Sequence, residues 1–185
     1  MALGTEHGFA QILARGTILR GWVLVEQGQG EAGIAQMRQG IAAHQATGAE
    51  AGLQHLALLA DAYGKGGQAE ESLTILAKAL ATMEKTEQRV HAPELHRLKG
   101  ELLLRQAVPD VAQAEVCFQQ ALAVARHQQA RSWELRTALS LSRLWQQGKR
   151  AEARELLVPI YSWFTEGFDT PDLQEAKALL EDLGT

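Results

Sequence analysis

The stretch LALLADAYGKGGQAEESLTILAKA, residues 56–79, contains two apolar segments with helical spacing, separated by the glycine pair at 66–67. In the first segment, Leu59 and Ala60 are followed by an aromatic residue. In the second, Ser72 is followed by a large residue at a spacing of four. Two antiparallel helices approach closely only where one presents a small residue to a large side chain of the other. The stretch therefore predicts a helix-turn-helix hairpin held by small-to-large contacts.

The same pattern occurs four times along the chain, at an almost constant interval. The small residues of the four first helices are Gly21, Ala60, Gly100 and Ser142. The second helices repeat the small-x3-large pattern from Gly33, Ser72, Ala114 and Ala153. Self-similarity at a fixed period is the signature of repeat architectures, and a period of about 40 leaves room for about two extra helical turns per hairpin.

These copies resemble the tetratricopeptide repeat (TPR), whose pattern is matched most fully by residues 56–79. The resemblance implies an all-α, right-handed α-solenoid of about four long TPR-like helix-turn-helix repeats plus a C-terminal closing helix. We expect a single TPR-like domain over residues 1–185, with repeats at approximately 8–47, 48–86, 87–129 and 130–166 and the closing helix at 170–183.

The prolines agree with this partition. Pro93 suits the first turn of a helix, where its missing N–H has no consequence. Thr170 and Pro171 form a second start signal, a hydroxyl residue followed by proline at the first helical position. Pro159 falls late in the eighth helix, which it should bend.

Composition excludes several classes of protein. The chain has 185 residues, 46% hydrophobic and 22% charged, with a net charge of −4. No stretch is long and apolar enough to span a membrane. The acidic balance gives no basic stripe for RNA or DNA, so we expect no nucleic-acid partner. The single cysteine, Cys117, favours a reducing compartment, and we expect a cytoplasmic location.

Four segments, residues 21–40, 56–79, 94–104 and 146–153, together resemble the C-terminal TPR arrays of large bacterial signalling ATPases, in particular those fused to class III nucleotide cyclase domains. The resemblance implies a regulatory sensor or scaffold that binds protein. It implies no catalysis in this chain, which has neither a phosphate-binding loop nor a strand pattern for a cyclase fold.

No residue set predicts an enzyme, a metal site or a cofactor site. His91 and His96 are five apart with Glu94 between them, whereas two ligands on one helix face need a spacing of three or four. Cys117 has no CxxC partner and no activating base in sequence, so a buried, inert thiol is the expected state. We predict no catalytic residues, no metal and no cofactor.

The first helices of TPR hairpins line the concave face, and the resemblance therefore implies a groove there. Carried over to this chain, the predicted groove residues are Arg15, Trp22, Asp61, Arg97, Glu101, Arg105, Arg136 and Arg143. Arginines in a groove are able to make forked hydrogen bonds to the carboxylates of an acidic peptide. The sequence therefore predicts a peptide or protein partner on this face.

Two alternatives stay open at this stage. Arg97 can instead pair with Glu94 or Glu101 at helical spacing, leaving a neutral, solvated face, and Trp22 can be covered by the N-terminal end. The second alternative is structural, with no separate ligand. An array whose first repeat has no polar cap exposes apolar surface, which would support stacking or a homodimer through Phe9 and Ile12.

Overall fold

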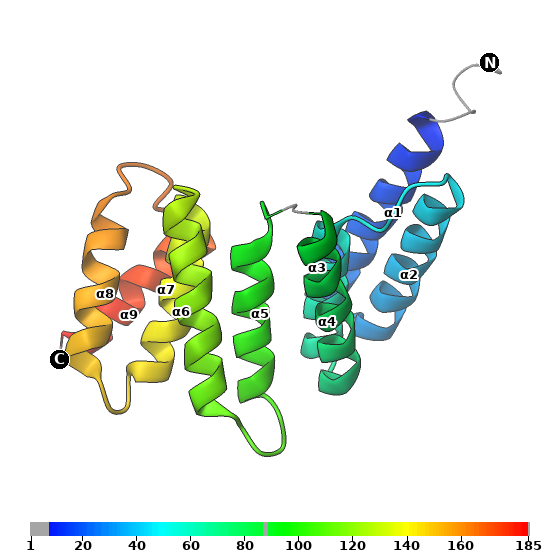
Figure 1. The fold of residues 1–185 in the computed structure, drawn as a ribbon. Coiled ribbons are helices and arrows are strands. Elements are labelled where there is room, and N and C mark those ends of the chain that lie inside the picture. Colours follow the sequence, from blue (N-terminus) through cyan, green and yellow to red (C-terminus); the bar gives the residue numbers. More distant parts are fainter. Residues whose placement is uncertain (1–7, 87–88, 185) are drawn as a thin grey trace. The chain divides into compact units, whose positions relative to one another are not determined.

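The computed structural model describes residues 8–86 and 89–184, and these residues form an all-α protein (Figure 1). The helices of the described residues are α1 (Gly8–Glu26), α2 (Gly30–Ala46), α3 (Leu53–Lys65), α4 (Ala69–Thr86), α5 (Ala92–Leu104), α6 (Val111–His127), α7 (Arg131–Trp145), α8 (Arg150–Ser162) and α9 (Pro171–Leu183). They pack in sequential pairs, α1 with α2, α3 with α4, α5 with α6 and α7 with α8, while α9 packs on α8 and α7.

The helices belong to two compact units. The first unit, Met1–Gln88, contains α1 to α4, and the second unit, Arg89–Thr185, contains α5 to α9. In the first unit, the core between α1, α2 and α3 includes Ile18, Met37 and Leu59. In the second unit, a larger core runs from Phe118 through α7 and α8 to α9, where Leu173 and its neighbours close it. Each unit therefore has a hydrophobic core of its own.

Small residues set the distance between the paired helices. A Cβ atom added to Gly21 of α1 would lie 2.7 Å from the carbonyl oxygen of Gly33, and one added to Gly33 of α2 would lie 2.5 Å from the carbonyl oxygen of Gly21. In the α5–α6 pair, a Cβ atom on Gly100 would lie 2.5 Å from the ring of Phe118. The small-to-large contacts predicted from these glycines are confirmed, and in α1–α2 the backbones themselves meet.

Serine takes over this role in the other two pairs. The Ser72 hydroxyl of α4 donates to the carbonyl oxygen of Ala60 in α3. The Ser142 hydroxyl of α7 donates to the carbonyl oxygen of Ala153 in α8, at 3.2 Å. Both serines are fully buried, so each hydroxyl needs such a partner. Here the short side chain allows close approach and also makes a hydrogen bond between the helices.

The helix ends lie where the sequence signals place them. Pro93 occupies the first turn of α5 and Pro171 begins α9. Thr170 precedes α9 as expected, but its hydroxyl donates to the carbonyl oxygen of Gly167 at 2.7 Å and does not cap the helix. Asp110, which precedes α6, accepts a hydrogen bond from the backbone N–H of Gln113 at 3.0 Å and so satisfies one amide of the first turn. Pro159 lies within α8, as expected, and the bend it should cause stays a prediction.

The turn between α3 and α4 depends on a glycine. Gly67 has a φ of 76°. This left-handed conformation favours glycine, which has no Cβ atom to clash with the backbone, and it is frequent just after a helix. It allows α3 to end sharply, so that α4 can begin two residues later at Ala69.

Replacing Gly21 by alanine should lower the free energy of unfolding by about 1–3 kcal/mol, because the added methyl group meets the backbone of α2 and the helices must separate. The control is Gly16→Ala in the same helix. A Cβ atom on Gly16 meets nothing within 4 Å, so this change should raise stability by about 0.5–1 kcal/mol. Urea unfolding followed by circular dichroism measures both, and equal effects would contradict the backbone contact.

Candidate functional site

An extended polar cluster in the second unit lies on one face of α5, α7 and α9, which we call the A-helix face. Helical spacing puts Glu94, Arg97 and Glu101 on the same side of α5, since residues three and four apart are neighbours on a helix. Helix α7 packs between α5 and α9, so its side chains reach both. The residues that α7 and α9 contribute are Arg136, Ser140, Arg143, Asp172 and Glu175.

Arg97 is the buried centre of this face, with only 9% of its surface exposed. Its Nε and Nη2 atoms each donate to the Glu94 carboxylate at 2.9 Å, which is the forked geometry that fixes a guanidinium in a plane. Its Nη1 atom lies 3.6 Å from Glu101 and donates to the Ser140 hydroxyl at 3.5 Å. Arg97 is therefore held by its own chain, in the pairing that helical spacing allowed.

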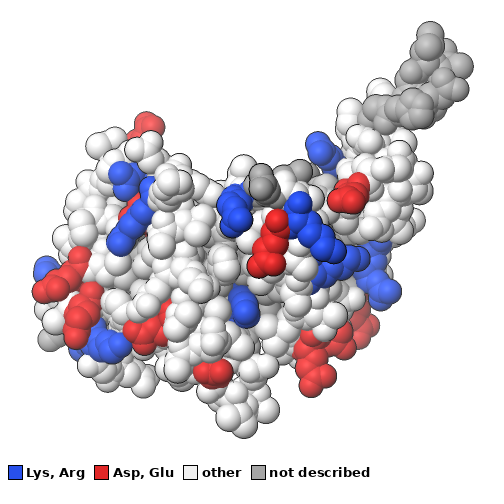
Figure 2. Space-filling model, viewed as in Figure 1, with Lys and Arg blue, Asp and Glu red and all other residues white. Residues whose placement is uncertain are grey.

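The other arginines of the face are paired too, but nearer to solvent. Arg136 lies 3.2 Å from Glu94 and 3.9 Å from Asp172. Arg143 forms an ion pair with Glu175 of α9. Arg105 lies 4.0 Å from Glu101 and is about half exposed. The face thus alternates positive and negative groups. Figure 2 shows where basic and acidic side chains lie on one side of the molecule.

A cavity of about 580 Å³ opens beside this network. Its lining includes Glu101, Ser140 and Arg143, together with the apolar side chains of Leu104 and Leu144. The Ser140 hydroxyl donates to Glu101 at 2.6 Å, so the acid in the cavity wall is already engaged by α7. Arg143, which is paired with Glu175, brings a partly exposed guanidinium to this partly apolar hollow, and a guanidinium is able to bind a carboxylate.

The surroundings of Arg143 shift its proton affinity. Partial burial lowers the pKa of the Arg143 guanidinium, the nearby charge of Arg97 lowers it further, and Glu101 and Asp172 oppose both effects. An arginine remains charged at neutral pH even when its pKa is lowered. The Arg143 guanidinium therefore remains a positive charge beside the cavity.

Three of the sequence-predicted residues, Arg15, Trp22 and Asp61, belong to the first unit. Arg15 is exposed on α1, and Trp22 is half-buried because it packs against the core of that unit. Asp61 lies 2.9 Å from Lys65, which also pairs with Glu26 of α1. Burial alone would lower the pKa of Lys65, but its bonds to Glu26 and Asp61 outweigh burial and raise it.

Sequence reasoning named the arginines of α5 and α7 but missed three of their partners. Ser140, Asp172 and Glu175 were not assigned to the site, because the last helix was treated only as a closing helix. Helix α9 packs on α7 and so stands where another first helix of a hairpin would stand. Treating 170–183 as such a helix would have placed Asp172 and Glu175 on the same face.

Solved structures of known proteins share this fold. The chain is similar to the nearly identical TPR-like repeats of a chain described as a kinesin light chain of Podosopora anserina, with 23% identity, a TM-score of 0.61 and coverage of 92% of each chain. It is similar to a single-substitution variant of the same protein with 22% identity, a TM-score of 0.63 and coverage of 96% of each. The fold is a TPR-like repeat array. No family model and no curated protein matches the sequence.

Two further findings concern the described residues only. In residues 8–86 and 89–184, no group of three or more His, Cys, Asp or Glu side chains is arranged to hold a metal ion. Within the same ranges, no helix has the length and apolar character that crossing a membrane requires. Cys117 is buried in α6, in agreement with the expected position of this thiol.

Removing Glu94 alone should be more harmful than removing the whole ion pair. We expect Glu94→Leu to lower the free energy of unfolding by about 2 kcal/mol, because it leaves the buried Arg97 guanidinium with poorer partners. Adding Arg97→Met to this variant should recover at least half of that loss, since no buried charge then remains at the position. Urea unfolding of both variants measures the difference.

The control is Glu181→Gln, which breaks an exposed pair with Lys177. It should change the free energy of unfolding by less than about 0.5 kcal/mol, as is usual for exposed ion pairs. A double variant less stable than Glu94→Leu would contradict the role of Glu94.

Proposed function

We propose that this chain is a protein-interaction module that binds an acidic peptide segment of a partner on the A-helix face of α5, α7 and α9. TPR-like repeat folds generally serve as protein-binding modules and are usually not catalytic. The observation that carries the proposal is the position of Arg143, a partly exposed guanidinium at a partly apolar cavity whose lining also includes Glu101 of α5 and Ser140 of α7.

Exchange of ion-pair partners makes such binding feasible. The pairs Arg143–Glu175 and Arg136–Asp172 are formed by side chains that are 39% to 49% exposed, so each pair contributes little to stability. A peptide carboxylate can therefore replace Glu175 or Asp172 at small cost. The buried Arg97 would stay paired and would hold Glu94, Glu101 and Ser140 in position.

The arginines and acids of the face have different roles in this proposal. Arg105, Arg136 and Arg143 contact the peptide, because each has an exposed guanidinium. Arg97 and Glu101 hold the face in shape, because both are largely buried and are bonded across helices to Ser140.

The residues of the first unit form a second part of the proposal. Arg15, Trp22 and Asp61 come from the corresponding positions of α1 and α3, and we propose that they contact partner residues outside the acidic segment. The partial exposure of Trp22 supports this role, since an aromatic side chain with one accessible face is a frequent anchor at protein interfaces.

A fluorescein-labelled hexapeptide of Asp and Glu with a free carboxyl terminus tests the main site. We expect Arg143→Gln and Arg136→Gln each to weaken binding about tenfold in fluorescence anisotropy, since a lost charge-assisted hydrogen bond is worth about 1.5 kcal/mol. Arg154→Gln is the matched control, because Arg154 is exposed on α8 outside the face. If all three variants lost the same affinity for the peptide, the loss would follow from the change in net charge alone, and this result would contradict the proposed site.

Self-association is the second candidate, favoured by the outer surface of α1. Large apolar side chains that are 42–64% exposed project from this helix within about 120° of its circumference; they are Phe9, Ile12, Leu13, Leu19 and Val23. They leave roughly 500 Å² of apolar surface in contact with water, near the upper limit for a monomer. Two copies joined through this surface would bury about 1,000 Å², the lower limit of a specific interface.

A symmetric pairing of α1 with α1 of a second copy fits better than head-to-tail stacking. The outward side of α9, which a head-to-tail stack would offer to α1, exposes Gln174, Lys177 and Glu181. These side chains do not complement an apolar surface. The α1 surface is complementary to itself, as an isologous contact requires.

Introducing charge into the α1 surface should dissociate the proposed dimer. The variant Ile12→Glu with Leu13→Glu should be a monomer at micromolar to tens of micromolar concentration, where the unmodified chain is a dimer in multi-angle light scattering, because buried unpaired charges are costly. Val108→Glu, which charges an apolar residue in the connection after α5 that is 83% exposed, is the control and should leave the dimer unchanged. A monomeric unmodified chain at all concentrations would remove this candidate.

We further propose that the module is a cytoplasmic regulatory part of a larger bacterial signalling protein. The support is the sequence resemblance of residues 21–40, 56–79, 94–104 and 146–153 to arrays of that kind. The complete reading frame of the gene tests this context. Phosphate-loop and cyclase motifs in the same frame would support it, and a frame without them would count against it.

A further inference from the structure

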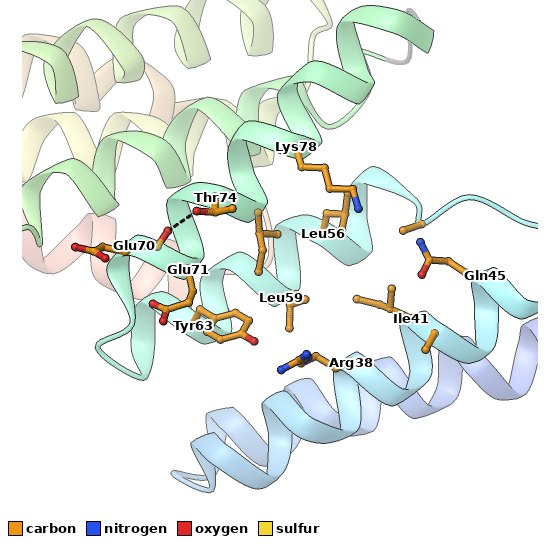
Figure 3. A pocket seen from close by; sticks show the side chains of 13 residues that line it. Arg38, Ile41, Gln45, Leu56, Leu59, Tyr63, Glu70, Glu71, Thr74 and Lys78 are labelled. Atoms are coloured by element: carbon orange, nitrogen blue, oxygen red, sulfur yellow. Dashed lines mark hydrogen bonds between the residues drawn. The ribbon is translucent and has the colours of Figure 1, made fainter.

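A groove in the first unit lies between α2 and α4, which are the second helices of their hairpins, whereas the A-helix face is formed mainly by first helices. A cavity of about 710 Å³ occupies it, over α3 (Figure 3). The floor is apolar and is formed by Ile41, Leu56, Leu59, Tyr63 and Ile75. Helices α2 and α4, both fully described, do not pack against each other, so the groove is open along its length.

The groove continues toward the C-terminal end of α4. A second cavity of about 310 Å³ shares Gln45, Ala51, Leu56 and Lys78 with the first and extends to Lys85. Glu70 lines the far end of the first cavity, so the combined groove follows α4 from Glu70 to Lys85. At 1.5 Å per residue this is about 22 Å, the length of four turns of helix.

The charges at the rim of the groove are not neutralised within the described residues. Glu70 and Glu71 line the end near the beginning of α4, Arg38 stands on the α2 wall, and Lys78 and Lys85 line the other end, where Glu50 from the connection between α2 and α3 also lines the second cavity. All six side chains are exposed, and none takes part in an ion pair between described residues. Figure 3 shows the two glutamates at one end of the cavity and Lys78 at the other.

The A-helix face differs in this respect. Its arginines 97, 105, 136 and 143 are all paired with acids of the same unit. The charges that α4 contributes to the groove are separated along the helix instead, with Glu70 and Glu71 at one end and Lys78 and Lys85 at the other, and Glu50 is the one further acid among the described residues that line the lysine end. A ligand with the reverse order of charges would therefore find opposite charges at both ends.

We propose that this groove binds an amphipathic helix of a partner protein, with acidic residues in its first turn, an apolar stripe, and basic residues in its last turn. The apolar floor requires apolar anchors at helical spacing. The basic end of the partner helix pairs with Glu70 and Glu71, and its acidic end pairs with Lys78 and Lys85. The bound helix therefore runs antiparallel to α4.

Two physical arguments favour a helix over an extended segment. The walls of the groove are helices whose backbone groups are already bonded internally, so an extended peptide would find few partners for its N–H and C=O groups. A helix satisfies these groups itself and packs on helices by its side chains. The antiparallel direction also agrees with the helix dipoles, because acidic residues are favoured at a helix N-terminus and basic ones at its C-terminus.

The probe is a fluorescein-labelled designed helix of about 15 residues, with Glu in its first turn, Leu at the i, i+4, i+7 and i+11 positions and Lys in its last turn. A second probe has the same composition with Glu and Lys exchanged. Fluorescence anisotropy with the full chain should show the first probe binding about tenfold tighter than the second, because only the first meets opposite charges at both ends of the groove.

Charge variants of α4 tie this preference to the groove. Glu70→Lys with Glu71→Lys should abolish the preference for the first probe, because the acidic end of the groove is then lost. Glu84→Lys should keep it, since this change reverses the charge of an exposed position of α4 outside the groove.

Size variants of α4 test the cavity itself. Thr74→Trp should fill the groove and weaken the first probe about tenfold or more. Ala77→Trp is the matched control, because Ala77 lies on the exposed outer side of α4 and does not line either cavity.

Three results would overturn the proposal: no binding of the first probe up to about 1 mM, equal binding of the two probes, or a preference that survives Glu70→Lys with Glu71→Lys. The helical probe reports on the groove and not on the A-helix face, so Arg143→Gln should leave its binding unchanged. Failure of the groove proposal and failure of the proposed function can therefore be told apart. Loss of the helical probe in Arg143→Gln would likewise contradict the assignment to the groove.

Discussion

The contact of helix backbones at small residues is the constraint on which the rest of this structure depends. Where Gly21 meets Gly33, a single added methyl group would overlap main-chain atoms that have no freedom to move aside. At Gly100 the neighbour is a buried aromatic ring, and at Ser72 and Ser142 a hydroxyl joins the two helices instead. Close packing of each hairpin brings its apolar side chains into the core. The polar sides of the helices remain at the surface, where their charged side chains can form ion pairs or contact a partner.

Two uses of charge follow from this arrangement. On the A-helix face, helices α5, α7 and α9 bring arginines and acids within ion-pairing distance. The central pair, Arg97 with Glu94, is the most buried of them. A buried Arg97 without Glu94 would be costly, so the geometry of that pair is set by the fold and not by a ligand. At the groove between α2 and α4, the charges that α4 contributes lie at separate ends, with Glu70 and Glu71 at one and Lys78 and Lys85 at the other. The arginines of the A-helix face are paired with acids of the same unit, whereas these four charged side chains have no ion pair among the described residues.

Much of the fold was predictable from the sequence, because small residues that recur at a period near 40 mark the positions where paired helices approach closely. The candidate site was predictable only in part. Helical spacing was enough to pair Arg97 with Glu94, since both lie on α5, but it could not pair Arg143 with Glu175, because that distance depends on how separate helices pack. The groove was missed because the pattern gave the second helix of each hairpin only a packing role, although polar residues recur at a spacing of four within 70–78 and so share one side of α4.

The interlock of Gly21 and Gly33 has a consequence for how this chain can vary in evolution. Each residue advances a helix by about 100°, so inserting or deleting one residue between either glycine and the turn would rotate it away from its counterpart and bring a bulkier residue into the crossing. Substitutions at positions of α1 and α2 that do not face the other helix would leave the crossing of the two helices intact, whereas changes of length within them would not. Length variation in this hairpin is therefore confined to the turn and the outer ends of the helices.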